Sequence, residues 1–298
     1  VALSDTARGT LFMCTAMAAF SLGDAVMKRI TMEVPLMQAI ALRGMLSVLA
    51  LALIAWLAGA LSFRMERTDA RLLGLRSLAE VGATLTFFAA LLHMELANLS
   101  AILQSLPLAV TLAAALFLAE PVGWRRLAAI GVGFLGVLCI IRPGTTAFDQ
   151  WSLMGLASVA LVVVRDLATR RMTTRLPSVT VALCAGLGVT LTGIGGVVAQ
   201  GGFVPVAPQN LALLCLAAST LILGYLTIVK AMRVGDIASV APFRYTALLW
   251  AILLGWLFFG TLPDAATWIG AALIVGSGLF TLAREARLRR VRAVGAPP

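Results

Sequence analysis

The chain has little charge for its length. Of its 298 residues only 12% are charged, whereas 61% are hydrophobic, and the mean hydropathy is +1.00. Soluble domains carry about 25% charged and about 45–50% apolar residues, and a single soluble core does not grow indefinitely with chain length. The composition therefore excludes an ordinary soluble domain and indicates a protein of the lipid bilayer.

Residue types used in catalysis and metal binding are also scarce. His93 is the only histidine, and no HExxH or GxSxG motif occurs. His93 is interpreted as an interfacial residue with satisfied hydrogen bonds, and pH sensing is the alternative. The four cysteines lie in apolar runs without metal-ligand spacing, which is typical of small buried side chains. Residues 131–136 match G-x-G-x-x-G, but within an apolar run these glycines indicate helix packing and not a nucleotide site. We expect no enzyme activity, no metal and no cofactor.

Ten apolar runs are long enough to span a bilayer, which needs about 20 residues per helix. They begin near Thr10, Pro35, Leu72, Leu99, Leu127, Leu153, Val179, Leu211, Ile237 and Trp268. Proline, glycine and charged residues separate the runs as short turns. The first run lacks a charged leader and an A-x-A-like end, so we expect it to remain as a helix. The sequence predicts an all-α polytopic membrane protein with about ten transmembrane helices.

The net charge of +10 is distributed unevenly along the chain. With the N-terminus inside, 16 of the 23 Lys and Arg residues fall on the inner side, 3 fall on the outer side and 4 lie within helices. Short cytoplasmic loops of membrane proteins carry an excess of positive charge. The distribution predicts a multi-pass protein of a bacterial-type inner (plasma) membrane with both termini in the cytoplasm. The basic tail Arg284–Arg292 is expected to face anionic lipid, and no nucleic-acid partner is expected.

Two segments share a spacing of charged residues and proline. In GDAVMKRITMEVPL and in RDLATRRMTTRLPS, an aspartate (Asp24 or Asp166) is followed by a basic residue four positions later and by proline eleven positions later. If each repeat holds five helices, the second repeat enters the membrane from the opposite side. Inverted repeats of this kind are typical of transporters. The sequence thus predicts two inverted five-helix repeats, residues 1–145 and 146–298, around a central cavity.

Two helix pairs resemble a known family. The fourth and fifth helices of EamA-type carriers, in the drug/metabolite transporter superfamily, resemble LPLAVTLAAALFLAEPVGWRRLAAIGVGFLGVLCIIRPG, and their ninth and tenth resemble APFRYTALLWAILLGWLFFGTLPDAATWIGAALIVGSGLFTLARE. The resemblance runs the full length and implies a ten-helix, inverted-repeat bundle that moves metabolites, commonly outward. Branches of the family export amino acids, aromatic ones among them, or carry S-adenosylmethionine. The chain departs from the family pattern at Leu22-Gly23, where Trp-Gly is frequent, and at Thr261, which replaces the acid that Glu120 supplies in the first half.

Charged residues inside the predicted spans are candidate solute-binding or gating residues, because each costs about 2.5–3.5 kcal/mol there. They are Asp24 and Arg43 toward the outer side, and Glu80, Asp166 and Arg244 toward the inner side. We expect each group to supply a gate or a clamp on the solute, Asp24 with Arg43 and Asp166 or Glu80 with Arg244. Fixed ion pairs that hold the bundle are the alternative, which is favoured for Arg76 and Arg165. Arg76 and Glu80 are four residues apart, so they can pair on one helix face.

Polar and aromatic residues near predicted helix breaks complete the candidate site. Pro107 and Pro242 occupy matching places in the fourth and ninth helices, where a missing backbone donor frees a carbonyl. Candidates for binding polar groups are Asn98, Gln104, Ser105 and Tyr245, with interhelical hydrogen bonds as the alternative. Candidates for stacking on an aromatic solute are Phe87, Phe88, Tyr225 and Trp250, with packing or lipid contact as the alternative.

The sequence favours an alternating-access transporter that exports amino acids or related small metabolites. A carrier of S-adenosylmethionine or amphiphilic drugs is the alternative within transport. A polytopic membrane enzyme or a channel is the alternative from another class. The expected partners are the small-molecule solute and the lipid bilayer.

Overall fold

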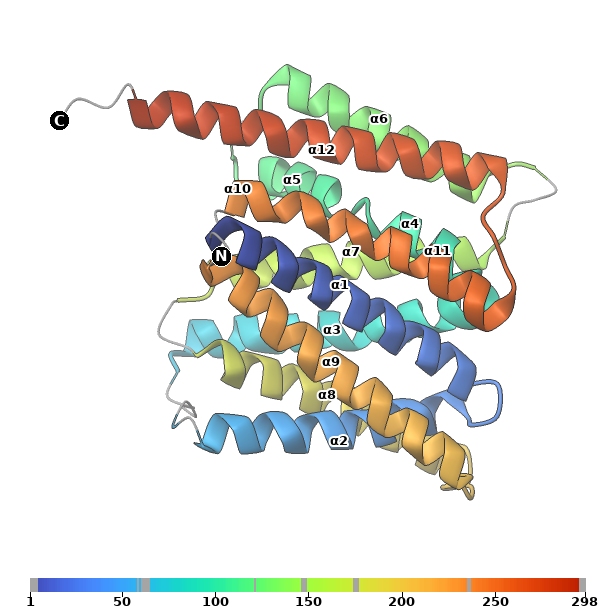
Figure 1. Ribbon diagram of the computed structural model, residues 1–298. Coiled ribbons are helices and arrows are strands. Elements are labelled where there is room, and N and C mark those ends of the chain that lie inside the picture. The colour runs from blue at the N-terminus through green and yellow to red at the C-terminus, as the bar shows by residue number, and fades with distance from the viewer. Residues whose placement is uncertain are drawn as a thin grey trace. The chain divides into compact units, whose positions relative to one another are not determined.

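Regular structure in the described chain is entirely helical. A computed structural model describes residues 5–57, 59, 65–120, 122–145, 149–173, 177–234 and 237–294, and ten helical spans in these ranges are long and apolar enough to cross a membrane. The predicted number of spans is therefore confirmed. In chain order the helices are α1 (Asp5–Ile30), α2 (Leu36–Leu57), α3 (Arg67–His93), α4 (Leu96–Leu103), α5 (Leu106–Phe117), α6 (Trp124–Ile141), α7 (Trp151–Arg171), α8 (Ser178–Ala199), α9 (Pro208–Val234), α10 (Ile237–Val240), the 3₁₀ helix η1 (Ala241–Tyr245), α11 (Thr246–Phe259) and α12 (Ala265–Val294) (Figure 1). Of the basic residues assigned to the inner side, Arg64 and Arg175 lie outside the described residues, as do the side chains of Arg289, Arg290 and Arg292.

Two spans are broken near their polar residues. Gln104 and Ser105 separate α4 from α5, and Pro107 lies at the start of α5, where its missing N–H removes no helical hydrogen bond. Before α11 the chain makes the 3₁₀ turn η1, with Pro242 in its first positions. Both prolines lie at a break, but Pro107 opens the second segment of its span whereas Pro242 opens the turn that precedes α11.

The two broken spans end in the same kind of turn. The main-chain N–H of Glu120 donates to the carbonyl six residues earlier, and so does the N–H of Thr261, both at 3.3 Å. The residue before each donor has a left-handed backbone, with φ of 53° at Ala119 and 66° at Gly260. The second turn therefore repeats the first at an offset of 141 residues.

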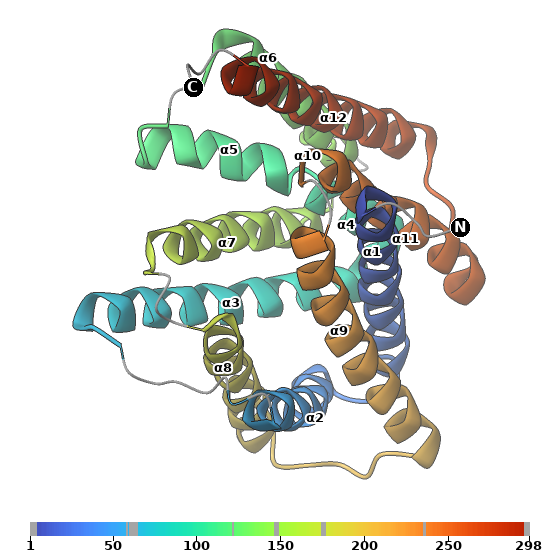
Figure 2. The same cartoon turned by 60° about the vertical axis from the view of Figure 1, so that its left-hand side comes forward.

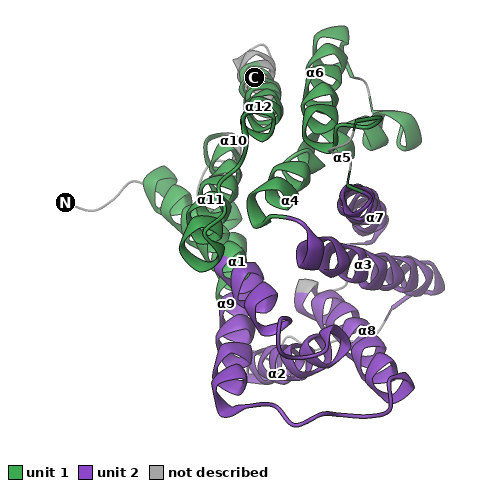
Figure 3. Cartoon of the chain, turned by 90° about the vertical axis from the view of Figure 1, so that its right-hand side faces the viewer, with its two compact units in different colours: residues 1–21, 95–149, 223–298 green, residues 22–94, 150–222 purple. Residues whose placement is uncertain are grey.

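The chain divides into two compact units, and each unit contains helices from both halves of the sequence (Figure 3). Unit 1 comprises residues 1–21, 95–149 and 223–298, and unit 2 comprises residues 22–94 and 150–222. The predicted repeats, divided at residue 145, are a different partition of the chain and stay a prediction.

In unit 1, α6 packs on α12 through glycine. A Cβ atom on Gly136 would lie 2.6 Å from the carbonyl oxygen of Gly270, and one on Gly270 would lie 2.5 Å from the carbonyl oxygen of Gly136. Glycine permits such close approach of two helix backbones. The expected packing role of the glycines in residues 131–136 is thus confirmed at Gly136.

In unit 2, α2 lies beside α8 and α3 lies beside α7 (Figures 1 and 2). A Cβ atom on Gly44 would collide with the Thr190 hydroxyl, and one on Gly186 would lie 3.1 Å from the Val48 side chain. Exchanging each residue for the one 142 positions away converts the first contact into the second. The same offset relates the aspartates of the two similar sequence segments, so α2 and α8 meet about a local two-fold relationship.

Candidate functional site

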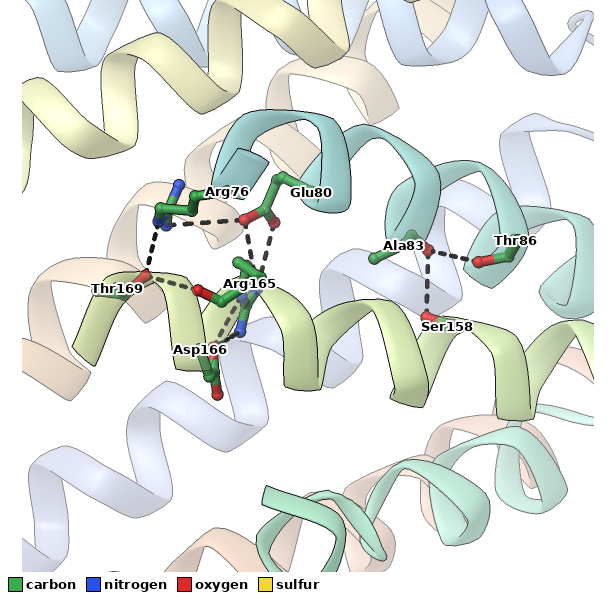
Figure 4. A network of polar contacts seen from close by, with 8 residues as sticks. All are labelled: Arg76, Glu80, Ala83, Thr86, Ser158, Arg165, Asp166 and Thr169. Atoms are coloured by element: carbon green, nitrogen blue, oxygen red, sulfur yellow. Dashed lines mark hydrogen bonds and ion pairs between the residues drawn. The ribbon is translucent and has the colours of Figure 1, made fainter. Parts of the chain in front are cut away.

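Arg165 of α7 lies at the centre of a charged network between α3 and α7 (Figure 4). Its guanidinium contacts Glu80 of α3 at 3.2 Å and the adjacent Asp166 at 2.9 Å. Arg76, one turn before Glu80, lies 3.7 Å from that carboxylate and donates to Thr169 Oγ1 at 3.1 Å. The predicted local pair of Arg76 and Glu80 is confirmed. Two acids and two bases balance the charge of the network.

Neutral contacts extend this interface on both sides of the charged network. The Ser158 hydroxyl donates to the carbonyl of Ala83 at 3.1 Å (Figure 4). At one end of α3, buried Asp69 accepts a 2.6 Å hydrogen bond from the Thr173 hydroxyl. These contacts fasten α3 to α7 at several levels.

The single histidine fastens the other end of the same two helices. His93 stacks on Trp151 with ring centroids 3.6 Å apart and planes 5° from parallel. Its Nδ1 lies 2.9 Å from the carbonyl of Ala89, so the ring has a hydrogen-bond partner. We call the set of contacts from Asp69–Thr173 to His93–Trp151 the α3–α7 zipper.

Glu80 and Asp166 thus have a partner within unit 2. Both bind Arg165, for which the sequence favoured a structural role. The predicted pairing of either acid with Arg244 stays a prediction, because Arg244 belongs to unit 1. The partner of Arg165 on α3 was not predictable, since neither helix alone encodes the register between them.

Asp24 and Arg43 interact electrostatically in unit 2, although no ion pair within 4.0 Å joins them. The guanidinium carbon of Arg43 lies 5.5 Å from the centroid of the buried Phe88 ring, which is a cation–π distance. Phe87 packs edge-on against Phe88, with centroids 5.2 Å apart. Opposite charges beside an aromatic pair are suited to binding a solute that has both polar groups and a ring.

Ser47 adds a buried hydroxyl to the same region of α2. It follows Arg43 by one helical turn, so the two side chains share a face. Its side chain is only 4% exposed, and its hydroxyl has no hydrogen-bond partner within the described residues. The sequence analysis missed Ser47, although its i, i+4 spacing from Arg43 was a usable signal.

Unit 1 contains the polar residues of the broken spans. The Gln104 amide donates to the main-chain carbonyl of Arg244 at 3.1 Å. Tyr245 is 7% exposed, and its hydroxyl occupies the space that a side chain at Gly278 would need. Neither that hydroxyl nor the Asn98 carbonyl oxygen has a hydrogen-bond partner in the part of the chain that is described.

The remaining aromatic candidates also lie in unit 1. Tyr225 is half-buried on α9. Trp250 packs against a buried cluster that includes Met13, Met17 and Val240. Packing, the alternative weighed for Trp250, is therefore a role that it does perform.

Two acidic residues outside the spans are held by hydrogen bonds. Asp264, just before α12, accepts hydrogen bonds from Arg142 and from the main-chain N–H of Thr267, and the first of these chiefly lowers its pKa to about 2. Glu33, between α1 and α2, accepts from Asn210 at 2.9 Å and pairs with Arg29 at 2.9 Å. These contacts, that of Asn210 first, lower the pKa of Glu33.

Sequence comparison identifies the family. The chain matches the EamA-like transporter family over residues 7–142 and again over residues 149–283. It belongs to the EamA-like transporter family. Membership and the ten spans together make it a multi-pass membrane transporter.

Individual relatives of this EamA-like chain are named for different solutes. A riboflavin transporter of Rhizobium johnstonii is 35% identical over 64% of this chain and 63% of its own length, so the match spans under two thirds of that relative. A pseudopaline exporter of Pseudomonas aeruginosa is 26% identical over 90% of this chain and 93% of its own length. An S-adenosylmethionine uptake transporter of Rickettsia felis is 24% identical over 61% of each chain.

The fold also matches a crystal structure of another protein. The TM-score is 0.63 and the identity 24%, over 95% of this chain and 99% of the other. This similarity shows that the ten-span EamA-type architecture extends over nearly the whole chain.

Proposed function

We propose that this EamA-like protein is an alternating-access carrier that exports small metabolites across a bacterial-type inner membrane. Residues 1–145 and 146–298 act as two inverted five-helix repeats, and both termini lie in the cytoplasm. The excess of Lys and Arg on one side of the predicted topology supports this orientation.

Internal symmetry is the observation that carries the proposal. The turn after α5 recurs after α11 at an offset of 141 residues, and the Gly44–Thr190 contact recurs as Gly186–Val48 at an offset of 142. The two matches to the family fall on opposite sides of residue 145. Exchange of shape between inverted repeats alternates access to a site between outside and inside.

Amino acids and riboflavin-like heterocycles are the two solute classes that we propose first. Arg43 can bind a carboxylate through its planar fork and Asp24 can bind an ammonium group, which favours amino acids. The aromatic pair of Phe87 and Phe88, together with the name of the Rhizobium relative, favours a heterocycle. S-adenosylmethionine, for which the Rickettsia relative is named, is the third solute to test.

Proteoliposomes containing the purified protein test this function. Labelled riboflavin, tryptophan and S-adenosylmethionine are supplied one at a time, and the initial rate is measured against concentration. A carrier gives a rate that saturates and is stimulated by unlabelled solute on the opposite side, whereas a channel gives neither. Absence of saturable flux for amino acids, flavins and S-adenosylmethionine alike would overturn the proposal.

A further inference from the structure

Asp24, Arg43 and Phe88 lie at the same depth in three successive spans of unit 2. Asp24 is six residues before the end of α1, Arg43 is seven after the start of α2, and Phe88 is five before the end of α3. At 1.5 Å per residue, each lies about 8–10 Å inside the same ends of the helices. Lys28, whose ammonium group contacts the carbonyl of Met94, confirms that α1 and the end of α3 meet on this side.

The polar groups at this depth lack partners of their own. Within the described residues the Asp24 carboxylate has no hydrogen bond or ion pair, and Arg43 has only its contact with Phe88. The Ser47 hydroxyl is more than nine-tenths buried and likewise unpartnered. Buried polar groups without partners are costly in proteins, and those that persist call for an explanation such as a ligand.

The aspartate 142 residues later behaves differently. Asp166 contacts Arg165 at 2.9 Å, and Arg165 also contacts Glu80, so charge is balanced within the protein. Of the two aspartates, only Asp24 is left to find its partner in a bound molecule.

Glycines hold the backbones on which these side chains stand. Gly23 precedes Asp24, and a Cβ atom there would lie 2.8 Å from Thr220 Oγ1. Gly44 follows Arg43, and a Cβ atom there would collide with Thr190. The two charged side chains therefore project from closely packed helices, which limits their movement before the solute arrives.

We propose that Asp24, Arg43 and Ser47 bind the imide edge of a neutral, flat heterocycle such as the ring of riboflavin. An imide presents one N–H donor between two carbonyl acceptors. Asp24 accepts from the N–H, while Arg43 and Ser47 each donate to a carbonyl, so one acceptor and two donors are matched in number and kind. The ring stacks on the Arg43 guanidinium, which is planar, with Phe87 beside it.

A zwitterionic amino acid matches this site less completely. Its carboxylate and ammonium group would engage Arg43 and Asp24 and leave the buried Ser47 hydroxyl without a role. The net charge of Asp24 with Arg43 is zero, which suits a neutral ring without additional ionic groups. The inference rests on the proposed carrier function and assigns its solute class.

Binding of riboflavin and of riboflavin methylated at the imide nitrogen tests the inference. With the wild-type protein in detergent, quenching of flavin fluorescence should show at least tenfold weaker binding of the methylated compound. Asp24→Ala should weaken riboflavin binding and reduce this discrimination to less than about twofold, whereas Asp24→Asn, which keeps an acceptor oxygen, should retain most of it. Asp264→Asn, an equivalent change outside the spans, is the matched control and should leave the discrimination intact.

The possible outcomes separate this inference from the carrier function. Undiminished discrimination in Asp24→Ala, or equal binding of both flavins by the wild-type protein, overturns the imide site. Saturable transport of tryptophan without riboflavin binding also overturns it, yet leaves the carrier function in place. Failure of the carrier function itself appears as absence of flux for every solute class in proteoliposomes. Monodisperse elution of each variant in size-exclusion chromatography shows that it is folded.

Discussion

The side-chain amide of Gln104 donates a 3.1 Å hydrogen bond to the main-chain carbonyl of Arg244, and so connects the break between α4 and α5 to the 3₁₀ turn η1. Non-helical backbone at membrane depth is tolerated only where protein or a water-filled cavity satisfies its polar groups. This contact satisfies one such carbonyl. It also links two spans that lie in different halves of the sequence.

Removal of the Gln104 amide should impair transport of every solute. Gln104→Ala is expected to lower stability by about 0.5–1.5 kcal/mol, the usual value of one hydrogen bond, and to slow flux in proteoliposomes. Gln150→Ala, at an exposed position before α7, is the control. Flux equal to wild type in Gln104→Ala would show that the contact has no part in transport.

Arg244→Ala separates the side chain from the main chain at the same position. The Gln104 contact uses the carbonyl of Arg244 and survives this substitution. We therefore expect normal insertion, with flux reduced about tenfold (about 1.4 kcal/mol) only for solutes that carry a carboxylate. Equal flux of tryptophan by the variant and the wild type would assign Arg244 a purely structural role.

Loss of Arg165 should destabilise unit 2 strongly. Arg165→Ala leaves the Glu80 and Asp166 carboxylates without their shared partner, and stranding buried charge costs about 3–5 kcal/mol. Because these side chains are partly exposed, at 24% and 35%, we expect about 1–3 kcal/mol, measured as a lower thermal midpoint in detergent. Arg71→Ala, at an exposed position on α3, is the control. The added substitution Glu80→Gln should restore part of the loss.

Asp24 and Asp166 should act in opposite directions on access. If they belong to opposing gates, Asp24→Asn raises labelling of a cysteine at Asn98 from outside, and Asp166→Asn raises it from inside. A change of about 1.4 kcal/mol in the difference between states alters their ratio tenfold. Impermeant thiol reagents on right-side-out and inverted vesicles, in a background without the four native cysteines, provide the measurement. A shift in the same direction for both variants contradicts the gating hypothesis.

Ala119→Gly should stabilise the protein. Ala119 has a left-handed backbone with φ of 53°, which costs about 1 kcal/mol in a residue with a Cβ atom, and Gly260 occupies the corresponding position 141 residues later. We expect a gain of about 0.5–1 kcal/mol in Ala119→Gly and a similar loss in Gly260→Ala. Thermal unfolding of the two variants should therefore give shifts of opposite sign.

The Asp264–Arg142 pair should make stability depend on acid pH. The pKa of Asp264 is lowered to about 2 from its usual 3.8, so the folded state binds this proton less readily than the unfolded state. Its contribution is present above pH 3.8 and is lost as the pH falls through about 2. Because Asp264 is about half exposed, we expect at most about 1 kcal/mol. Asp264→Asn should remove this part of the change in thermal midpoint between pH 5 and pH 2, and an unchanged pH profile would contradict the assignment.

Composition and punctuation were enough to predict the spans, because a bilayer imposes one length on every helix that crosses it. The pair of Arg76 and Glu80 was predictable for a similar reason, since both residues lie on one helix. The central place of Arg165 and the burial of Ser47 depend on how separate helices pack. Sequence periodicity carries little information about packing in a span that is apolar on every side.

The zipper between α3 and α7 has a consequence for biosynthesis. Unit 2 lacks residues 95–149, so α3 leaves the ribosome 55 residues before the chain reaches its partner helix. At about 5–20 residues per second, synthesis of that stretch takes roughly 3–11 s. During this interval Glu80 waits in the bilayer without Arg165, and Arg76, one turn away on the same helix, is the cation that keeps its carboxylate company until α7 is inserted.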